Sequence, residues 1–182
     1  MKDYLLEGSL GEYLQDLFQV EFIHDKVVPN SGVRSRPDYR NDKLKLIVEF
    51  DGYKHYTLTS RIIADNNKDK IYSEMGYKIV RIPYFIQWET RTVKHYFNID
   101  KEYPQTFPHG FIVEKSEGLI MPADFCSMGV NLFIDQMKQL PDDIRTEVMQ
   151  SLKQKAEKYN PLEVYPIEIQ NYDWYCEYEE LT

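Results

Sequence analysis

Leucines recur at helical spacing near the start of the chain, at positions 6, 10, 14 and 17. This spacing predicts a helix over 3–18. Ser9 and Glu12 also have the spacing of a capping box, so the helix can equally begin at Ser9. The next stretch, 19–28, has the pattern of a strand, and the Pro-Asn-Ser-Gly sequence at 29–32 predicts a turn.

Strand and helix patterns then alternate through the middle of the chain. In chain order they predict strands over 36–39 and 43–51 joined by a hairpin turn at 40–42, a helix over 59–75, a strand over 77–85 and a helix over 90–97. Gly76 is a favourable end for the long helix because glycine readily adopts the left-handed conformation of a C-terminal cap. This order of elements predicts an α/β fold with a mixed central sheet flanked by helices.

The character of the chain changes after residue 97. Prolines and glycines mark irregular chain, followed by a hairpin expected over 110–121 with its turn at 116–118. A clear helix is predicted from residue 141 to 159, and 162–169 alternates like an edge strand. We therefore expect a core over 1–97 and a C-terminal helical or irregular extension over 98–182. The extension would pack on the core and serve recognition, dimerisation or binding of a partner.

Charge is distributed unevenly along the chain. The whole chain carries 22 Lys and Arg against 30 Asp and Glu, a net charge of −8. Segment 25–94 reverses this balance with fourteen basic and nine acidic residues, which favours a nucleic-acid partner; uneven surface charge without a function is the alternative. The acidic, amphipathic N-terminal stretch is unlike a signal peptide, and no apolar run approaches the roughly 20 residues of a membrane span, so we expect a cytoplasmic protein.

One predicted strand of the basic segment carries acids on a single face. Glu49 and Asp51 are two residues apart, so their side chains point the same way, while Val48 points to the other face. A strand with one apolar face and two acids on the other face is costly unless the acids bind something, and Mg²⁺ prefers carboxylate oxygens as ligands. Asp38, arriving from the neighbouring strand, would complete such a metal site.

Several patterns around these acids resemble one superfamily of nucleases. Pro37-Asp38 followed by Glu49-x-Asp51 resembles the active-site signature of the PD-(D/E)XK nucleases. The stretch 48–56 (VEFDGYKHY) resembles more specifically the branch related to the very short patch repair endonucleases. The stretch 65–81 (DNNKDKIYSEMGYKIVR) and the N-terminal Ser9-x-x-Glu12 are similar to further elements of that branch. Together the matches run from Ser9 to Phe85, and nothing comparable covers 98–182.

The resemblance implies a restriction-endonuclease-like core and assigns roles to single positions. Asp38 matches the first metal-binding carboxylate and Glu49 the second, and the backbone carbonyl of Phe50 would also face the metal. Asp51 falls where the superfamily places its lysine, although the related branch often lacks lysine there. We expect Asp51 to be a further metal ligand or to orient water. The zinc-binding residues of the repair enzymes are absent, so their mismatch specificity is not carried over.

The lysine missing at position 51 leaves its role to a neighbouring cationic group. Lys54, His55 or Lys68 can stabilise charge or move a proton during phosphodiester hydrolysis, and we favour His55 because imidazole titrates near neutral pH. Glu12 matches the N-terminal acid and is either a helix cap or part of the metal shell. The candidate phosphate ligands are basic residues near the site, namely Arg34, Arg36, Arg40, Arg61 and Lys68.

Structural alternatives accompany these assignments. Glu49 and Asp51 can form a solvated strand face paired with Lys45 and Arg81, and His55 can donate to a backbone carbonyl. The arginines can balance nearby acids instead of binding phosphate. Each alternative makes a geometric prediction that a structure can compare with the functional one.

The sequence as a whole predicts a metal-dependent DNA endonuclease, a hydrolase that uses Mg²⁺ with Mn²⁺ as a substitute, from a restriction, repair or mobile-element setting. DNA is the expected partner, and a homodimer or a partner protein bound through 98–182 is a further expectation. The alternative is a nuclease fold with lost or reduced catalysis that binds DNA or protein, including an acidic inhibitor of a nucleic-acid-handling complex. Asp51 in place of lysine and the acidic flanks favour that alternative.

Overall fold

A single four-stranded sheet lies at the centre of the computed structural model, which describes residues 4–112 and 120–166. Its strands are β1 (Ile23–His24), β2 (Tyr39–Asn41), β3 (Leu46–Asp51) and β4 (Lys78–Pro83), in that spatial order. β1 and β2 pair antiparallel, as do β2 and β3, whereas β3 and β4 are parallel. The sheet is therefore mixed, as the sequence predicts.

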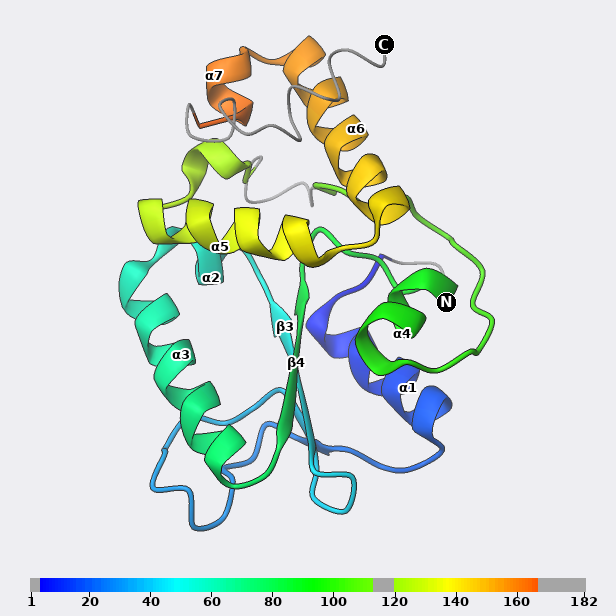
Figure 1. Ribbon diagram of the computed structural model, residues 1–182, viewed down its shortest axis with the longest axis vertical. Coiled ribbons are helices and arrows are strands. Elements are labelled where there is room, and N and C mark those ends of the chain that lie inside the picture. Colours follow the sequence, from blue (N-terminus) through cyan, green and yellow to red (C-terminus); the bar gives the residue numbers. More distant parts are fainter. Residues whose placement is uncertain (1–3, 113–119, 167–182) are drawn as a thin grey trace.

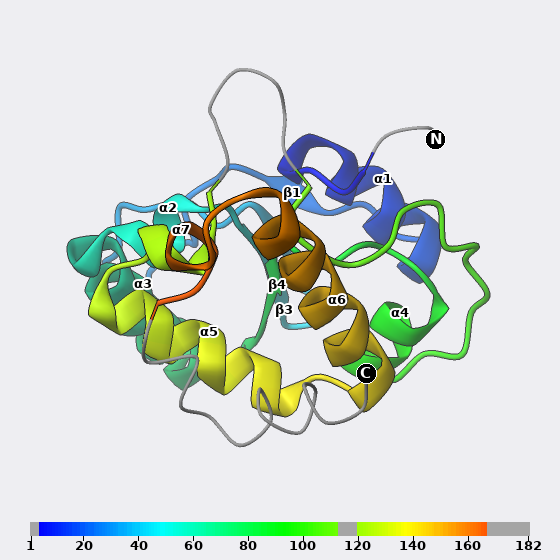
Figure 2. The same cartoon turned by 90° about the horizontal axis from the view of Figure 1, so that it is seen from above.

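Helices cover both faces of the sheet. They are α1 (Glu7–Phe18), α2 (Lys54–Thr57), α3 (Thr59–Glu74), α4 (Thr90–Phe97), the 3₁₀ helix η1 (Pro122–Asp124), α5 (Ser127–Gln139), α6 (Asp142–Lys158) and α7 (Pro161–Val164). Figure 1 shows α3 on one side of β3 and β4, and α1 with α4 on the other. Figure 2, seen from above, has the same arrangement, with α5 crossing near the end of β4. The predicted α/β class with helices on both faces of the sheet is confirmed.

Strand β3 is buried on both faces because different helices cover each one. Val48 belongs to the main core with Leu10 and Leu14 of α1, whereas Ile47 packs with Tyr72 of α3 in a second cluster. Strands that connect through a helical crossover to a parallel neighbour are typically buried on both faces. The acids of β3 consequently lie under α3 rather than on a solvated face.

Three of the predicted helices form where the sequence places them. Helices α3, α4 and α6 match the predictions over 59–75, 90–97 and 141–159 within one residue at each end. Gly76 follows α3 with a φ of 83°, the left-handed conformation expected of its cap. Helix α1 begins at Glu7, two residues before Ser9, because the Ser9 hydroxyl accepts a hydrogen bond from the Leu6 backbone N–H at 3.1 Å.

The prediction of a strand over 19–28 is mostly wrong. Only Ile23 and His24 pair with β2. Some carbonyls of this segment accept hydrogen bonds from side chains instead of from a strand: Arg40 donates to the carbonyl of Val27 at 2.8 Å, and Asn41 donates to that of Glu21 at 3.0 Å. Side-chain donors from β2 therefore take the place of ladder hydrogen bonds at these positions.

The prediction of a strand over 162–169 is also wrong in the part that the structure describes. Pro161–Val164 forms α7, because the Asn160 side chain accepts a hydrogen bond from the Leu162 N–H at 3.0 Å and caps the helix. The hairpin predicted over 110–121 has its turn at 116–118, which lies outside the described residues together with the rest of 113–119 and the chain beyond 166.

Helix α5 has no counterpart in the sequence-based prediction. It docks on α2 at Gly129, where a Cβ would lie 1.8 Å from the carbonyl oxygen of Tyr56. The Tyr56 hydroxyl donates to Gln136 of α5 at 2.8 Å, and its carbonyl accepts from the Cys126 N–H. A backbone contact this close requires glycine, so a residue that weakens helix propensity also permits the packing.

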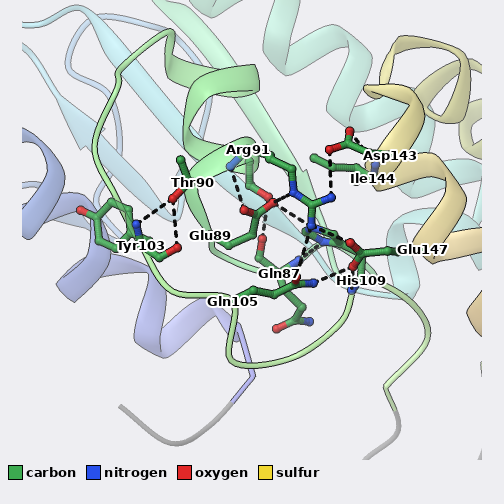
Figure 3. A network of polar contacts seen from close by, with 11 residues as sticks. Gln87, Glu89, Thr90, Arg91, Tyr103, Gln105, His109, Asp143, Ile144 and Glu147 are labelled. Atoms are coloured by element: carbon green, nitrogen blue, oxygen red, sulfur yellow. Dashed lines mark hydrogen bonds and ion pairs between the residues drawn. The ribbon is translucent and has the colours of Figure 1, made fainter.

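A polar network joins α6 to the segment around α4 (Figure 3). Glu147 of α6 accepts hydrogen bonds from Arg91 and from Gln105, each at 2.6 Å. The fully buried His109 accepts from the Gln87 N–H at Nδ1 and donates from Nε2 to Glu89 at 3.2 Å. This network and the main core both include residues from each side of position 98. Within the described ranges, each helix is too short or too polar to cross a bilayer.

Candidate active site

A cleft of about 560 Å³ opens at the C-terminal end of β3. Its walls come from the start of α1, the segment before β2, the turn after β3, and the facing sides of α2 and α3. Its charged and titratable lining residues are Glu7, Arg36, Asp38, Glu49, Lys54, His55, Arg61, Asp65 and Lys68. Most of the residues that the sequence analysis selected therefore meet in one cleft.

Asp38 and Glu49 are held together at this cleft by reciprocal backbone hydrogen bonds. The Asp38 N–H donates to Glu49 Oε2 at 3.2 Å, and the Phe50 N–H donates to Asp38 Oδ2 at 2.7 Å. The antiparallel pairing of β2 with β3 sets this register, since Asp38 directly precedes β2. Burial and the nearby charge of Glu49 raise the pKa of Asp38 to about 7.

Lys68 brings an ammonium group from α3 onto Glu49. Its Nζ lies 2.8 Å from Glu49 Oε1 and 3.2 Å from Asp65 Oδ1, as ion pairs in a nearly buried position. Burial alone would lower the pKa of Lys68, but the charge and hydrogen bonding of Glu49 outweigh it and raise that pKa. Lys68 therefore stays charged, and it takes the place beside Glu49 that the sequence analysis left open for a cation.

His55 and Asp65 form a second pair in the cleft. Nδ1 of His55 lies 2.7 Å from Asp65 Oδ2, a distance at which the ring N–H donates to the carboxylate. Burial alone would raise the pKa of Asp65, but the hydrogen bond from His55 and the charge of Arg81 outweigh it and lower that pKa. The predicted backbone-carbonyl partner of His55 is thus replaced by a carboxylate.

Asp51 does not join Asp38 and Glu49 at the cleft. Its side chain is 1% exposed, and its Oδ1 lies 2.6 Å from Nη1 of Arg81 and 3.4 Å from Nδ1 of His55. The expected convergence of three carboxylates on one ion is therefore not found. Over the described parts of the chain, no group of three or more His, Cys, Asp and Glu side chains is arranged to hold a metal.

Two carboxylates and one carbonyl remain as oxygen donors for a cation. The Phe50 carbonyl accepts a hydrogen bond from the Gly52 N–H at 3.1 Å, which leaves it one lone pair. Mg²⁺ commonly binds one or two carboxylates and completes its coordination with water and substrate phosphate. Asp38, Glu49 and the Phe50 carbonyl fit that mode of binding.

The predicted phosphate ligands divide into two groups. Arg36 and Arg61 are exposed and line the cleft, although Arg36 also lies 3.2 Å from Asp25. Arg34 is exposed but lies outside the cleft lining. The prediction for Arg40 is wrong, because it is 4% exposed and binds the carbonyl of Val27. Lys54, also in the lining, is exposed and lies above the Tyr53 ring at 5.9 Å.

The acid that α1 contributes is Glu7 rather than Glu12. Glu12 is exposed and outside the cleft lining, whereas Glu7 lines the cleft from the first turn of the helix. The charge of Glu7 also contributes to the raised pKa of Asp38, after burial and Glu49. No motif singles out Glu7, since its position depends on how the start of α1 meets β3. Asp65 begins the stretch 65–81 that resembles the nuclease branch, but that resemblance gives it no role in the site.

Comparisons with known proteins identify no relative of this chain. No family model, no curated protein and no solved structure matches the chain. The functional argument therefore rests on the geometry of the cleft and on the sequence patterns that led to it.

Proposed function

We propose that this protein is a metal-dependent endonuclease that hydrolyses phosphodiester bonds in DNA. The observation that carries the proposal is the reciprocal pairing of Asp38 with the Glu49–Phe50 backbone and side chain at an open cleft. Two acids held side by side in an open cleft can bind a cation, and the exposed Lys54 and Arg61 at its rim can bind a phosphate. Such an arrangement is more typical of a functional site than of residues that only stabilise the fold.

Each residue has a chemical task in this proposal. Asp38, Glu49 and the Phe50 carbonyl would hold Mg²⁺, or Mn²⁺ in its place. The bound ion would supply Lewis-acid stabilisation of the phosphate and an activated water. Lys68 places a positive charge beside Glu49, where it can stabilise the charge that develops on the phosphate oxygens. His55, oriented by Asp65, is placed to move a proton.

A nuclease fold with reduced catalysis is the second candidate. It is favoured by the ion pair that Lys68 already forms with Glu49 and by the absence, within the described residues, of a group of three metal-binding side chains. Such a protein would bind DNA through the same rim without cutting it. The cleavage assay below distinguishes the two candidates directly.

The test is cleavage of supercoiled and linear DNA by the purified protein with Mg²⁺ or Mn²⁺. We expect cleavage that EDTA abolishes. Asp38→Asn and Glu49→Gln keep the side-chain shape but remove a charged oxygen ligand, and Lys68→Met removes the cation beside it. Each is expected to lower the cleavage rate by about 100-fold or more.

Asp135→Asn is the matched control, because Asp135 is an exposed acid on α5 outside the cleft lining. It is expected to cleave like the wild type. DNA binding without cleavage under either metal would favour the second candidate. Cleavage that survives Asp38→Asn would reject the metal assignment.

A further inference from the structure

Arg81 lies behind the cleft and binds three aspartates. It is paired with Glu49 across β3 and β4, so its side chain points to the same side of the sheet as the acids. Its Nη1 lies 2.6 Å from Asp51 Oδ1, and its Nε and Nη2 lie 2.7 Å and 2.8 Å from the two oxygens of Asp69. Nη2 also lies 3.5 Å from Asp65 Oδ1.

Asp65 connects this buried group to the cleft. One of its oxygens accepts from His55 at 2.7 Å, and the other lies 3.2 Å from Lys68 as well as facing Arg81. Asp51 Oδ1 lies 3.4 Å from the same His55 nitrogen, Nδ1. Nδ1 of His55 therefore faces two carboxylates, and both of these carboxylates are paired with Arg81.

The shape of the guanidinium explains why arginine suits this position. Its planar fork donates in several fixed directions at once, whereas an ammonium is a compact point charge. Without Arg81, the buried acids Asp51 (1% exposed) and Asp65 (9% exposed) would repel each other, and Asp51 would keep only the more distant His55 as a charged neighbour. Loss of Arg81 therefore frees the carboxylates to move apart, and His55 and Lys68 move with them.

We propose that Arg81 is a positioning residue, which orders Asp51, Asp65 and Asp69 into a buried ion-pair frame and thereby fixes His55 and Lys68 in the cleft. Asp51 belongs to this frame and is not a metal ligand. The expected effect of Arg81 on the cleavage rate rests on the proposed nuclease function, whereas its effect on the positions of His55 and Lys68 does not depend on that function.

The main rival is that Arg81 itself binds substrate phosphate. Its side chain is 17% exposed, and each of its three nitrogens already faces a carboxylate oxygen within 2.8 Å. It also lines a different cavity, of about 610 Å³, together with Asp69, and not the cleft that holds Asp38. A phosphate ligand would be expected to keep free donors that point into the cleft.

The first experiment separates positioning from substrate binding by steady-state cleavage kinetics. Arg81→Met is expected to lower kcat by about 10–100-fold with KM within about twofold of wild type. The reason is that displacement of His55 and Lys68 slows the chemical step but leaves the affinity for DNA nearly unchanged. Asp69→Asn, at a half-exposed edge of the frame, is expected to lower kcat by about 3–10-fold and covers the case in which Arg81→Met does not fold. A raised KM with unchanged kcat, or no effect in either folded variant, would overturn the proposal.

The second experiment does not depend on cleavage. In the metal-free protein, ¹⁵N-labelled histidine NMR is expected to show the His55 Nδ1 proton hydrogen-bonded and slow to exchange. Arg81→Met or Asp69→Asn should shift this resonance or make it exchange rapidly. Arg145→Met is the control, because Arg145 is also ion-paired with an aspartate, Asp142, but on α6. An unchanged His55 resonance in both frame variants would refute the frame.

Calorimetry with Mg²⁺ tests the place of Asp51 separately. Asp51→Asn is expected to leave the metal affinity within about twofold, whereas Asp38→Asn should remove most of it. Loss of affinity in Asp51→Asn equal to that in Asp38→Asn would make Asp51 a ligand and contradict its place in the frame. If the wild type does not cleave DNA, the proposed function fails, while the NMR result still decides on the frame.

Discussion

The fold disfavours the ionised form of the Asp38 carboxyl group. Burial, then the charge of Glu49, raises its pKa from the usual value of 3.8 to about 7. Between these two pH values the folded protein holds a proton that the unfolded chain releases, so stability falls as pH rises through this window. The ionised form therefore destabilises the metal-free fold by an amount on the order of a few kcal/mol.

We predict from this that Asp38→Asn stabilises the metal-free protein at pH 8 more than at pH 5. Asparagine is neutral at both pH values, whereas in the folded protein the aspartate is ionised only at the higher one. The measurement is denaturant unfolding of variant and wild type in EDTA at the two pH values. A stability difference that does not change with pH would contradict the raised pKa. Added Mg²⁺ should stabilise the wild type at pH 8 but not the variant.

The proximity of Asp38 and Glu49 could be predicted from the sequence, but the burial of Asp51 could not. Two-residue periodicity correctly puts Glu49 and Asp51 on one face. It carries no information on what covers each position, and that depends on Arg81 from β4 and on Asp65 from α3. Of the structural alternative, a solvated strand face paired with Lys45 and Arg81, only the pairing with Arg81 is found, at Asp51. Both acids are buried, and Glu49 pairs with Lys68.

At the scale of elements, α6 is joined to the rest of the protein by charged hydrogen bonds as well as by its apolar face. Arg91 lies between Glu147 at 2.6 Å and Asp143 at 3.0 Å, both from α6 (Figure 3). Burial alone would raise the pKa of Glu147, but the bonds from Arg91 and Gln105 outweigh it and lower that pKa. Burial lowers the pKa of His109 in the same network.

Because the pKa values of Glu147 and His109 are both lowered, a fall in pH weakens the polar network that joins α6 to the rest of the protein. A carboxyl with a lowered pKa contributes stability that is lost as pH falls, and so does a histidine that is buried in its neutral form. We predict that Glu147→Gln lowers the free energy of unfolding by about 1–3 kcal/mol at pH 7 and by less at pH 4. Denaturant unfolding measures the change. Glu157→Gln, exposed on the same helix, is the control, and an equal effect in both variants would contradict the role of the network.

The periodicity of apolar residues correctly locates the helices that bury one continuous apolar face, such as α3 and α6. It failed where other parts of the chain decide the outcome. The strand expected over 19–28 is short because side chains of Arg40 and Asn41 bind its carbonyls. Helix α5 has no counterpart in the prediction, and Gly129 lowers its helix propensity although the close approach to Tyr56 requires a glycine.

At the scale of the whole molecule, an acidic protein presents a basic rim around an acidic cleft. The chain has a net charge of −8, yet exposed Lys54 and Arg61 flank the opening. For the proposed DNA substrate, the negative charge of the rest of the surface would disfavour binding elsewhere, while the basic rim would attract phosphates locally. DNA affinity should therefore depend on a few cations and fall with salt as counterions are displaced.

We predict that Lys54→Ala/Arg61→Ala weakens DNA binding and reduces the slope of log affinity against log salt by about 2, since each phosphate contact contributes about 0.9. Binding is measured without divalent metal, by fluorescence anisotropy between about 50 and 200 mM salt. Lys155→Ala/Lys158→Ala removes the same charge from the last turns of α6 and leaves the cleft intact. If the rim binds phosphate, only the first pair changes the slope. Equal changes in both pairs would mean that net charge alone governs the interaction, and a flat salt response in the wild type would mean that DNA is not the partner.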